Sequence, residues 1–126
     1  MNTFVWILQI VLAFGFLMAG AMKLTQPRAK LAKLGPQMAW VEDFSDSQVQ
    51  AIGLVEIAAA LGLILPAATD IVPILTPLAA AGLVIVMVRA AATHLHRHEA
   101  QFVPVNAMLL IMAAVVAYAR FGPYSF

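Results

Sequence analysis

The sequence contains no cysteine. This absence excludes disulfide bonds, a thiol nucleophile, and zinc or iron–sulfur sites held by cysteine. A redox role would therefore need a bound cofactor or a partner protein. Charged residues are also scarce, at 10% of the chain against about 25% in an ordinary soluble domain. Because the formal net charge is only +1, the chain has no basic surface for nucleic acid.

Hydrophobic residues are abundant, at 63% of the chain against about 45–50% in a soluble domain. With 126 residues there is room for one domain. A domain of this size buries a smaller share of its surface than a large one, so in water it would expose large apolar patches. The composition therefore predicts an integral membrane protein with a single domain over residues 1–126.

Four apolar runs have the length that a membrane-spanning helix needs, about 20 residues. They cover residues 4–22, 51–69, 71–93 and 100–119. None shows the alternation of apolar and polar residues that is typical of a membrane β-barrel. The sequence therefore predicts an all-α fold, a bundle of four transmembrane helices.

The first two runs are separated by 28 residues, 23–50, more than a simple connector needs. Leu31 and Leu34 would share one face of a short helix in this loop. Basic residues flank them at Arg28, Lys30 and Lys33. Such a pattern predicts an interfacial helix that lies on the membrane surface.

The basic residues predict the orientation of the bundle, because they gather on the cytoplasmic side of membrane proteins. In the four-helix arrangement Arg120 stands alone on one side. Six bases share the other: Lys23, Arg28, Lys30, Lys33, Arg89 and Arg97. We therefore expect both termini to face outward, and the long loop and the histidine-rich loop to face the cytoplasm.

This orientation places polar residues from all four helices in the cytoplasmic third of the bilayer, and leaves the outer two thirds almost purely apolar. The residues are Lys23, Glu56, Arg89 with His94, and Asn106. Ionisable groups at membrane depth are costly and usually face a bundle interior in pairs. Glu56 could pair with Lys23 or with Arg89. Such a pair could be structural, fixing the helix register, or could form a substrate or proton site.

The histidines near residue 95 also raise the question of a metal site. His94 and His98 are four residues apart, and Glu99 follows them. Two imidazoles and one carboxylate are few defined ligands for a metal. We favour histidines that lie near anionic lipid headgroups, and no metal site is predicted.

Several short motifs resemble the DoxX / DoxX-like family. They are Gly20-x-x-Lys23-Leu24, Gly53-x-x-Glu56 followed by Gly62 and Leu65-Pro66, and Asn106 in the last span. The resemblance covers nearly the whole chain and implies a small multi-pass protein of the bacterial inner membrane. Some family members are linked to quinone or thiosulfate oxidation, and others to oxidative-stress complexes. The resemblance implies that Lys23, Glu56 and Asn106 are the functional positions of this chain.

Two functions remain open. The first is a redox-associated protein that binds a quinone-like or other lipophilic small molecule at the polar layer. Glu56 would exchange a proton, and Lys23 or Arg89 would polarise a carbonyl oxygen. The substrate would contact Arg89, His94, Asn106 and Trp40. The second is a non-catalytic membrane subunit or scaffold that docks an oxidoreductase, another partner or a second copy of itself. Whether the protein is an enzyme is left open.

Overall fold

The computed structural model describes all 126 residues and contains helices but no strand. Four long helices are long and apolar enough to cross a membrane. They are α1 (Asn2–Thr25), α3 (Asp46–Thr69), α4 (Leu75–His96) and α5 (Val103–Phe121), the last preceded by a 3₁₀ turn, η2 (Ala100–Phe102). The predicted all-α bundle of four transmembrane helices is confirmed.

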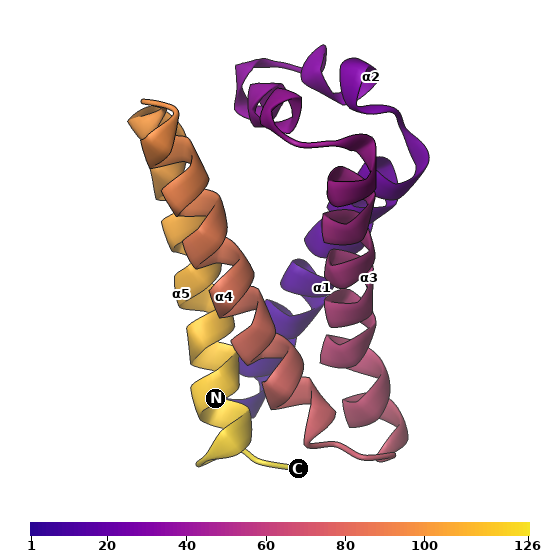
Figure 1. Cartoon of the computed structure of the whole chain (residues 1–126). Coiled ribbons are helices and arrows are strands. Elements are labelled where there is room, and N and C mark those ends of the chain that lie inside the picture. Colours follow the sequence, from indigo (N-terminus) through magenta and orange to yellow (C-terminus); the bar gives the residue numbers. More distant parts are fainter.

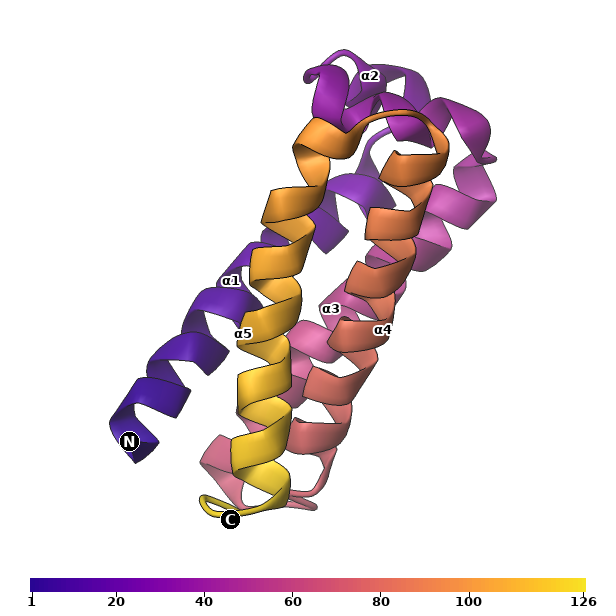
Figure 2. The ribbon, with the colours of Figure 1, turned by 90° about the vertical axis from the view of Figure 1, so that its left-hand side faces the viewer.

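The helices form two antiparallel pairs, α1 with α3 and α4 with α5 (Figure 1). The pairs lie close together at the end that holds both termini and the α3–α4 turn, here called the terminal end. They diverge toward the opposite end, which holds α2 and the α4–α5 turn and is called the loop end. Figure 2 shows the same arrangement from the side, with both termini far from α2. This divergence sets the shape of the site described below.

The core lies where the two pairs meet, and every long helix contributes to it. Leu12, Leu63, Leu83 and Val116 are fully buried, each exposing 1% or less of its surface. Large apolar side chains also cover the outside of the bundle. Phe14, Phe4, Ile85, Ile111 and Leu54 are among them, each about half exposed or more. So much contiguous apolar surface would be unfavourable in water, whereas lipid chains cover it without a free-energy penalty.

The loop between α1 and α3 folds into a cap over the loop end, residues 26–45. It contains the five-residue helix α2 (Arg28–Ala32) and the 3₁₀ helix η1 (Pro36–Asp43). Leu31 is fully buried against Val41 and Val49, whereas Leu34 is 48% exposed. The short helix exists as expected, but it ends at Ala32, so that Leu34 lies beyond it and does not share its buried face. Leu31 packs inside the protein because Val41 and Val49 offer an apolar surface there.

Helix α3 begins at a complete capping box. The backbone N–H of Gln48 donates to Ser45 Oγ at 3.1 Å, and the backbone N–H of Ser45 donates to Gln48 Oε1 at 2.9 Å. Two otherwise free helix N–H groups are thus satisfied. Helix α3 therefore has a defined start at the edge of the cap.

Candidate functional site

A buried ion pair joins α1 to α3 near the loop end. Lys23 Nζ donates to Glu56 Oε1 at 2.6 Å, and the two residues are only 9% and 3% exposed. Of the two partners that the sequence left open for Glu56, the structure selects Lys23. The carboxylate and the ammonium compensate one another's charge, which makes ionised groups tolerable at this depth.

Two glycines explain why this pair can form. Gly20 and Gly53 precede Lys23 and Glu56 by three residues, so each lies on the same helix face as its charged neighbour. A Cβ atom at Gly20 would lie 2.6 Å from the Gly53 carbonyl oxygen, and one at Gly53 would lie 2.7 Å from the Gly20 carbonyl oxygen. The two backbones are therefore in direct contact. This close approach brings the side chains one turn further along within hydrogen-bonding distance.

Beside the ion pair lies a cavity of about 860 Å³, between the diverging helix pairs and beneath the cap. Of its 25 lining residues, 17 are hydrophobic, so its walls are mainly apolar. The polar layer predicted from the sequence lies in this cavity. All six of the predicted site residues line it: Lys23, Trp40, Glu56, Arg89, His94 and Asn106.

The cap closes the cavity at the loop end. Trp40 packs edge-on against Phe44, with ring centroids 5.5 Å apart, and Lys23 Nζ lies 5.7 Å from the Trp40 ring. A cation over an aromatic face is attracted to it electrostatically. Trp40 therefore lies over the ion pair and forms part of the cavity wall.

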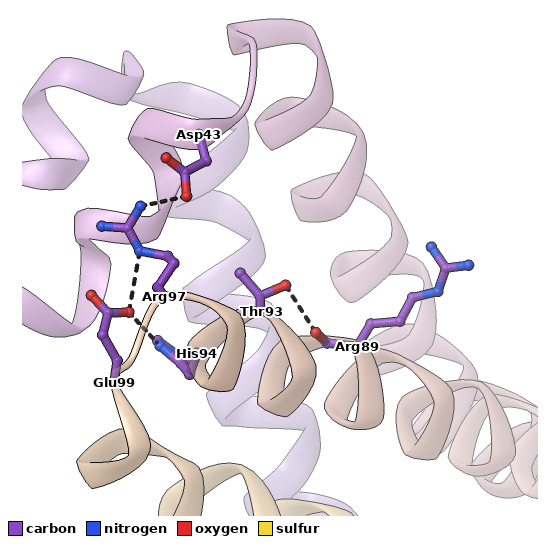
Figure 3. A network of polar contacts seen from close by, with 6 residues as sticks. All are labelled: Asp43, Arg89, Thr93, His94, Arg97 and Glu99. Atoms are coloured by element: carbon purple, nitrogen blue, oxygen red, sulfur yellow. Dashed lines mark hydrogen bonds and ion pairs between the residues drawn. The ribbon is translucent and has the colours of Figure 1, made fainter.

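Two polar side chains at the cavity have no protein partner. Asn106 is half-buried, and its amide nitrogen Nδ2 is fully buried without a hydrogen-bond acceptor. Arg89 is exposed, and its guanidinium forms no ion pair within the protein. Figure 3 shows its side chain directed away from the neighbouring polar network. Both groups are donors for which the chain supplies no acceptor.

A polar network at the α4–α5 turn ties the cap to α4 (Figure 3). His94 Nδ1 lies 2.9 Å from Glu99 Oε1, and Arg97 Nε donates to the same oxygen at 3.3 Å. Arg97 Nη1 also donates to Asp43 in the cap. The hydrogen bond to His94, together with Arg97, lowers the pKa of the Glu99 carboxyl, and the hydrogen bond to Asp43 raises the pKa of Arg97.

This network explains the position of His94, which is only 7% exposed and borders the cavity. The sequence suggested a histidine near headgroups and weighed a metal site with His98 and Glu99. In the structure Glu99 Oε1 lies 2.9 Å from His94 Nδ1, and no group of three or more His, Asp or Glu side chains is placed to hold a metal. The contributions of Asp43 and Arg97 were not predicted, because they lie 54 residues apart in the chain.

A second polar cluster lies at the terminal end, where the sequence suggested an apolar interior. Gln9 is fully buried; its Nε2 donates to the Leu63 carbonyl oxygen at 2.7 Å, and its Oε1 accepts from Arg120 Nε at 2.7 Å. Arg120 is 2% exposed and also donates to Asn2 Oδ1 and to the Tyr124 carbonyl oxygen. The sequence carries two signals of this cluster, Gln9 within the first apolar run and Arg120 at the end of the last.

Comparison with known proteins agrees with this arrangement. The sequence profile of the DoxX-like family matches residues 7–116, most of the chain. The chain belongs to the DoxX-like family. No curated protein and no solved structure matches it. Family membership and the four apolar helices together establish a multi-pass membrane protein.

In this DoxX-like protein, the motif residues of different helices meet at one place. Gly20 and Gly53 form the α1–α3 contact, Lys23 and Glu56 form the ion pair, and Asn106 approaches from α5 across the cavity. The result is an apolar cavity with donors from three helices and one carboxylate. Such an arrangement can hold an apolar molecule and orient a hydrogen-bond acceptor on it.

Proposed function

We propose that this DoxX-like protein binds a lipophilic small molecule in the cavity at the loop end. One observation carries the proposal: a cavity of about 860 Å³ with mainly apolar walls contains the polar residues of all four helices. Ligand pockets commonly measure about 300–1,000 Å³ and combine apolar walls with a few placed polar groups. The cavity has both properties.

A quinone-like molecule is the specific class that we propose. When bound, a quinone supplies an apolar ring and two carbonyl oxygens, and accepts electrons together with protons. Lys23 Nζ and the unpartnered Asn106 Nδ2 would hold the carbonyl oxygens as hydrogen-bond donors. Glu56 Oε1, already beside Lys23, would hold or move a proton there. Because the chain has no cysteine, a redox role would take its electrons from a partner oxidoreductase.

The second candidate function is a scaffold that docks such a partner. The observation that favours it is the outer surface of the cap, where Lys30, Lys33 and Leu34 are exposed. Basic side chains beside an exposed leucine suit a partner with acidic residues around an apolar patch. This function does not exclude ligand binding, but it does not require the cavity.

We further propose that the protein lies in the bacterial inner membrane with both termini outward. The loop end holds the cap with its three bases and the α4–α5 turn with Arg97, whereas Arg120 lies at the terminal end. The positive-inside rule then places the loop end in the cytoplasm. A reporter fused after Phe126 should be active on the outer side; activity in the cytoplasm would reverse the orientation.

The binding proposal is tested by filling the cavity. Gly15 lines it, and a Cβ atom at Gly15 meets nothing within 4 Å, so Gly15→Leu should fold while it occupies cavity space. Gly82→Leu is the matched control, since Gly82 also has open space around it but does not line the cavity. The measurement is mass spectrometry of lipophilic molecules retained by gently purified protein.

We expect wild type and Gly82→Leu to retain the same molecule, and Gly15→Leu to lose most of it. Equal retention in all three proteins would contradict binding in this cavity. If no molecule is retained but one protein partner co-purifies with all three variants, the scaffold function is favoured instead.

A further inference from the structure

The charges that line the cavity do not balance. Four ionisable residues line it: Lys23, Glu56, Arg89 and His94. Glu56 compensates Lys23 at 2.6 Å, and His94 is hydrogen-bonded to Glu99. Arg89 has no acidic partner in the protein. The cavity therefore has one guanidinium whose charge the chain itself does not neutralise.

The position of Arg89 makes this imbalance costly. It lies seven residues before the end of α4 at His96, which corresponds to about 10 Å along the helix. A guanidinium stays protonated in proteins, so it cannot remove the cost by losing its proton. A cation at membrane depth needs an anion, a water-filled space or lipid headgroups within its reach. An anion in the adjoining cavity meets this need directly.

The cavity is open toward the lipid and closed toward the loop end. Several of its lining residues are more than half exposed on the sides of the helices, namely Val11, Val55 and Val105 at 51%, 53% and 57%. At the loop end, the cap covers it with Trp40 and Phe44, and the Arg97–Asp43 ion pair fastens the cap to the end of α4. A molecule dissolved in the membrane can therefore reach the cavity without moving the cap.

From these observations we infer that the ligand is a membrane-dissolved amphiphile with one anionic group, which binds to Arg89 while the apolar part fills the cavity. A guanidinium pairs with a carboxylate or phosphate through two parallel hydrogen bonds. The inference rests on the proposed binding of a lipophilic molecule in this cavity, and it replaces the quinone-like class with an anionic one. An uncharged quinone would satisfy Lys23 and Asn106 but would leave Arg89 without a counter-charge.

The two tryptophans allow a direct test. Trp40 lines the cavity, whereas Trp6 lies at the terminal end with its ring 5.8 Å from Phe126. Trp6→Phe leaves Trp40 as the only reporter, and Trp40→Phe leaves Trp6 to report non-specific partitioning. The probes are dibromostearic acid at alkaline pH, where its carboxyl is ionised, and its uncharged methyl ester. Bromine quenches tryptophan fluorescence at short range. The protein is placed in nanodiscs of phosphatidylcholine.

We expect the acid to quench Trp40 at about tenfold lower concentration than the ester, the effect of one charge-assisted hydrogen bond. Arg89→Gln in the same background should remove this preference. Lys33→Gln should keep it, because Lys33 is an exposed base at the same end but outside the cavity. If phosphatidylglycerol in the nanodiscs abolishes the preference, the anion is a phospholipid phosphate; if not, it is the free acid.

The outcomes separate this inference from the proposed function. Equal quenching of Trp40 by acid and ester, lost for both in Gly15→Leu, would overturn the anionic class and leave the cavity as a binding site. A preference for the acid that survives Arg89→Gln would also overturn it, because another group would then bind the anion. Quenching of Trp40 no stronger than that of Trp6 would contradict ligand binding altogether.

Discussion

The bundle contains two polar clusters, and they differ in how far the protein satisfies them. At the terminal end, Gln9 uses both its amide nitrogen and its amide oxygen on Leu63 and Arg120, and the Arg120 guanidinium lies 4.3 Å from the Phe126 ring. At the loop end, Asn106 Nδ2 and the Arg89 guanidinium have no protein acceptor. In the first cluster only one buried nitrogen, Arg120 Nη2, has no partner, and the other groups are hydrogen-bonded within the chain. The second cluster borders a cavity of about 860 Å³.

The difference fits a structural role for the terminal cluster and the proposed ligand site at the loop end. Buried polar groups in a native protein usually find partners, and an unsatisfied one calls for an explanation. The terminal cluster links α1, α3, α5 and the C-terminal residues, so its hydrogen bonds hold the helix pairs together. The loop-end cluster leaves donors directed at apolar space. Substitutions at the two ends should therefore affect different properties.

The largest effect should come from breaking the buried ion pair. Lys23→Met leaves Glu56 without a counter-charge, and removing one partner of a buried pair costs about 3–5 kcal/mol. Adding Glu56→Gln should restore most of the stability, because replacement of both charges is often nearly neutral. The measurement is the free energy of unfolding in detergent micelles. Arg89→Met is the control and should change the free energy of unfolding little. A large loss of stability in Arg89→Met, with no loss in Lys23→Met, would contradict the Lys23–Glu56 pairing.

A smaller loss should follow from separating the backbones that bring this pair together. Gly20→Ala places a Cβ atom 2.6 Å from the Gly53 carbonyl oxygen, so α1 and α3 must shift apart. Overpacking of this kind costs about 1–3 kcal/mol. Gly15→Ala, with open space around its Cβ in the interior of α1, should not lower the unfolding free energy. Equal stability of the two variants would mean that the helices adjust without strain.

The terminal cluster should affect stability but not ligand retention. Gln9→Leu removes hydrogen bonds to Leu63 and Arg120, and hydrogen bonds between membrane helices contribute about 0.6 kcal/mol each. We therefore expect a loss of about 1 kcal/mol in the unfolding free energy, with the co-purifying molecule still present. Gln50→Leu, at an exposed position on α3, is the control. Loss of the ligand in Gln9→Leu alone would show that the two clusters are coupled.

The smallest effect should be a pH dependence at the α4–α5 turn. Because the hydrogen bond to His94 and the neighbouring Arg97 lower the pKa of Glu99, its ionised form stabilises the folded state. This contribution is present above the ordinary carboxyl pKa, about 4.3, and is lost as the pH falls through the lowered value. The difference in unfolding temperature between wild type and Glu99→Gln should therefore shrink on acidification. The control is Glu42→Gln, since Glu42 is exposed. If its difference in unfolding temperature from wild type also shrinks on acidification, the pH dependence does not come from Glu99.

Much of the architecture could be predicted because it depends on local properties. A run of about 20 apolar residues indicates a membrane helix wherever it packs, and the structure has four helices that are long and apolar enough to cross a membrane. The depth of a residue follows from its position along such a helix. This is why Lys23, Glu56, Arg89 and Asn106 were placed in one layer before any contact between the helices was known.

The tertiary structure alone decided the pairings within and around that layer. Whether Glu56 meets Lys23 or Arg89 depends on how each helix is rotated about its axis, and the Gly20–Gly53 contact sets that rotation for α1 and α3. The Gln9–Arg120 and Asp43–Arg97 pairs join residues 111 and 54 positions apart, a distance at which sequence spacing has no bearing on contact. The length of the apolar runs determines that the helices enter the membrane, whereas close packing between their surfaces determines which side chains meet.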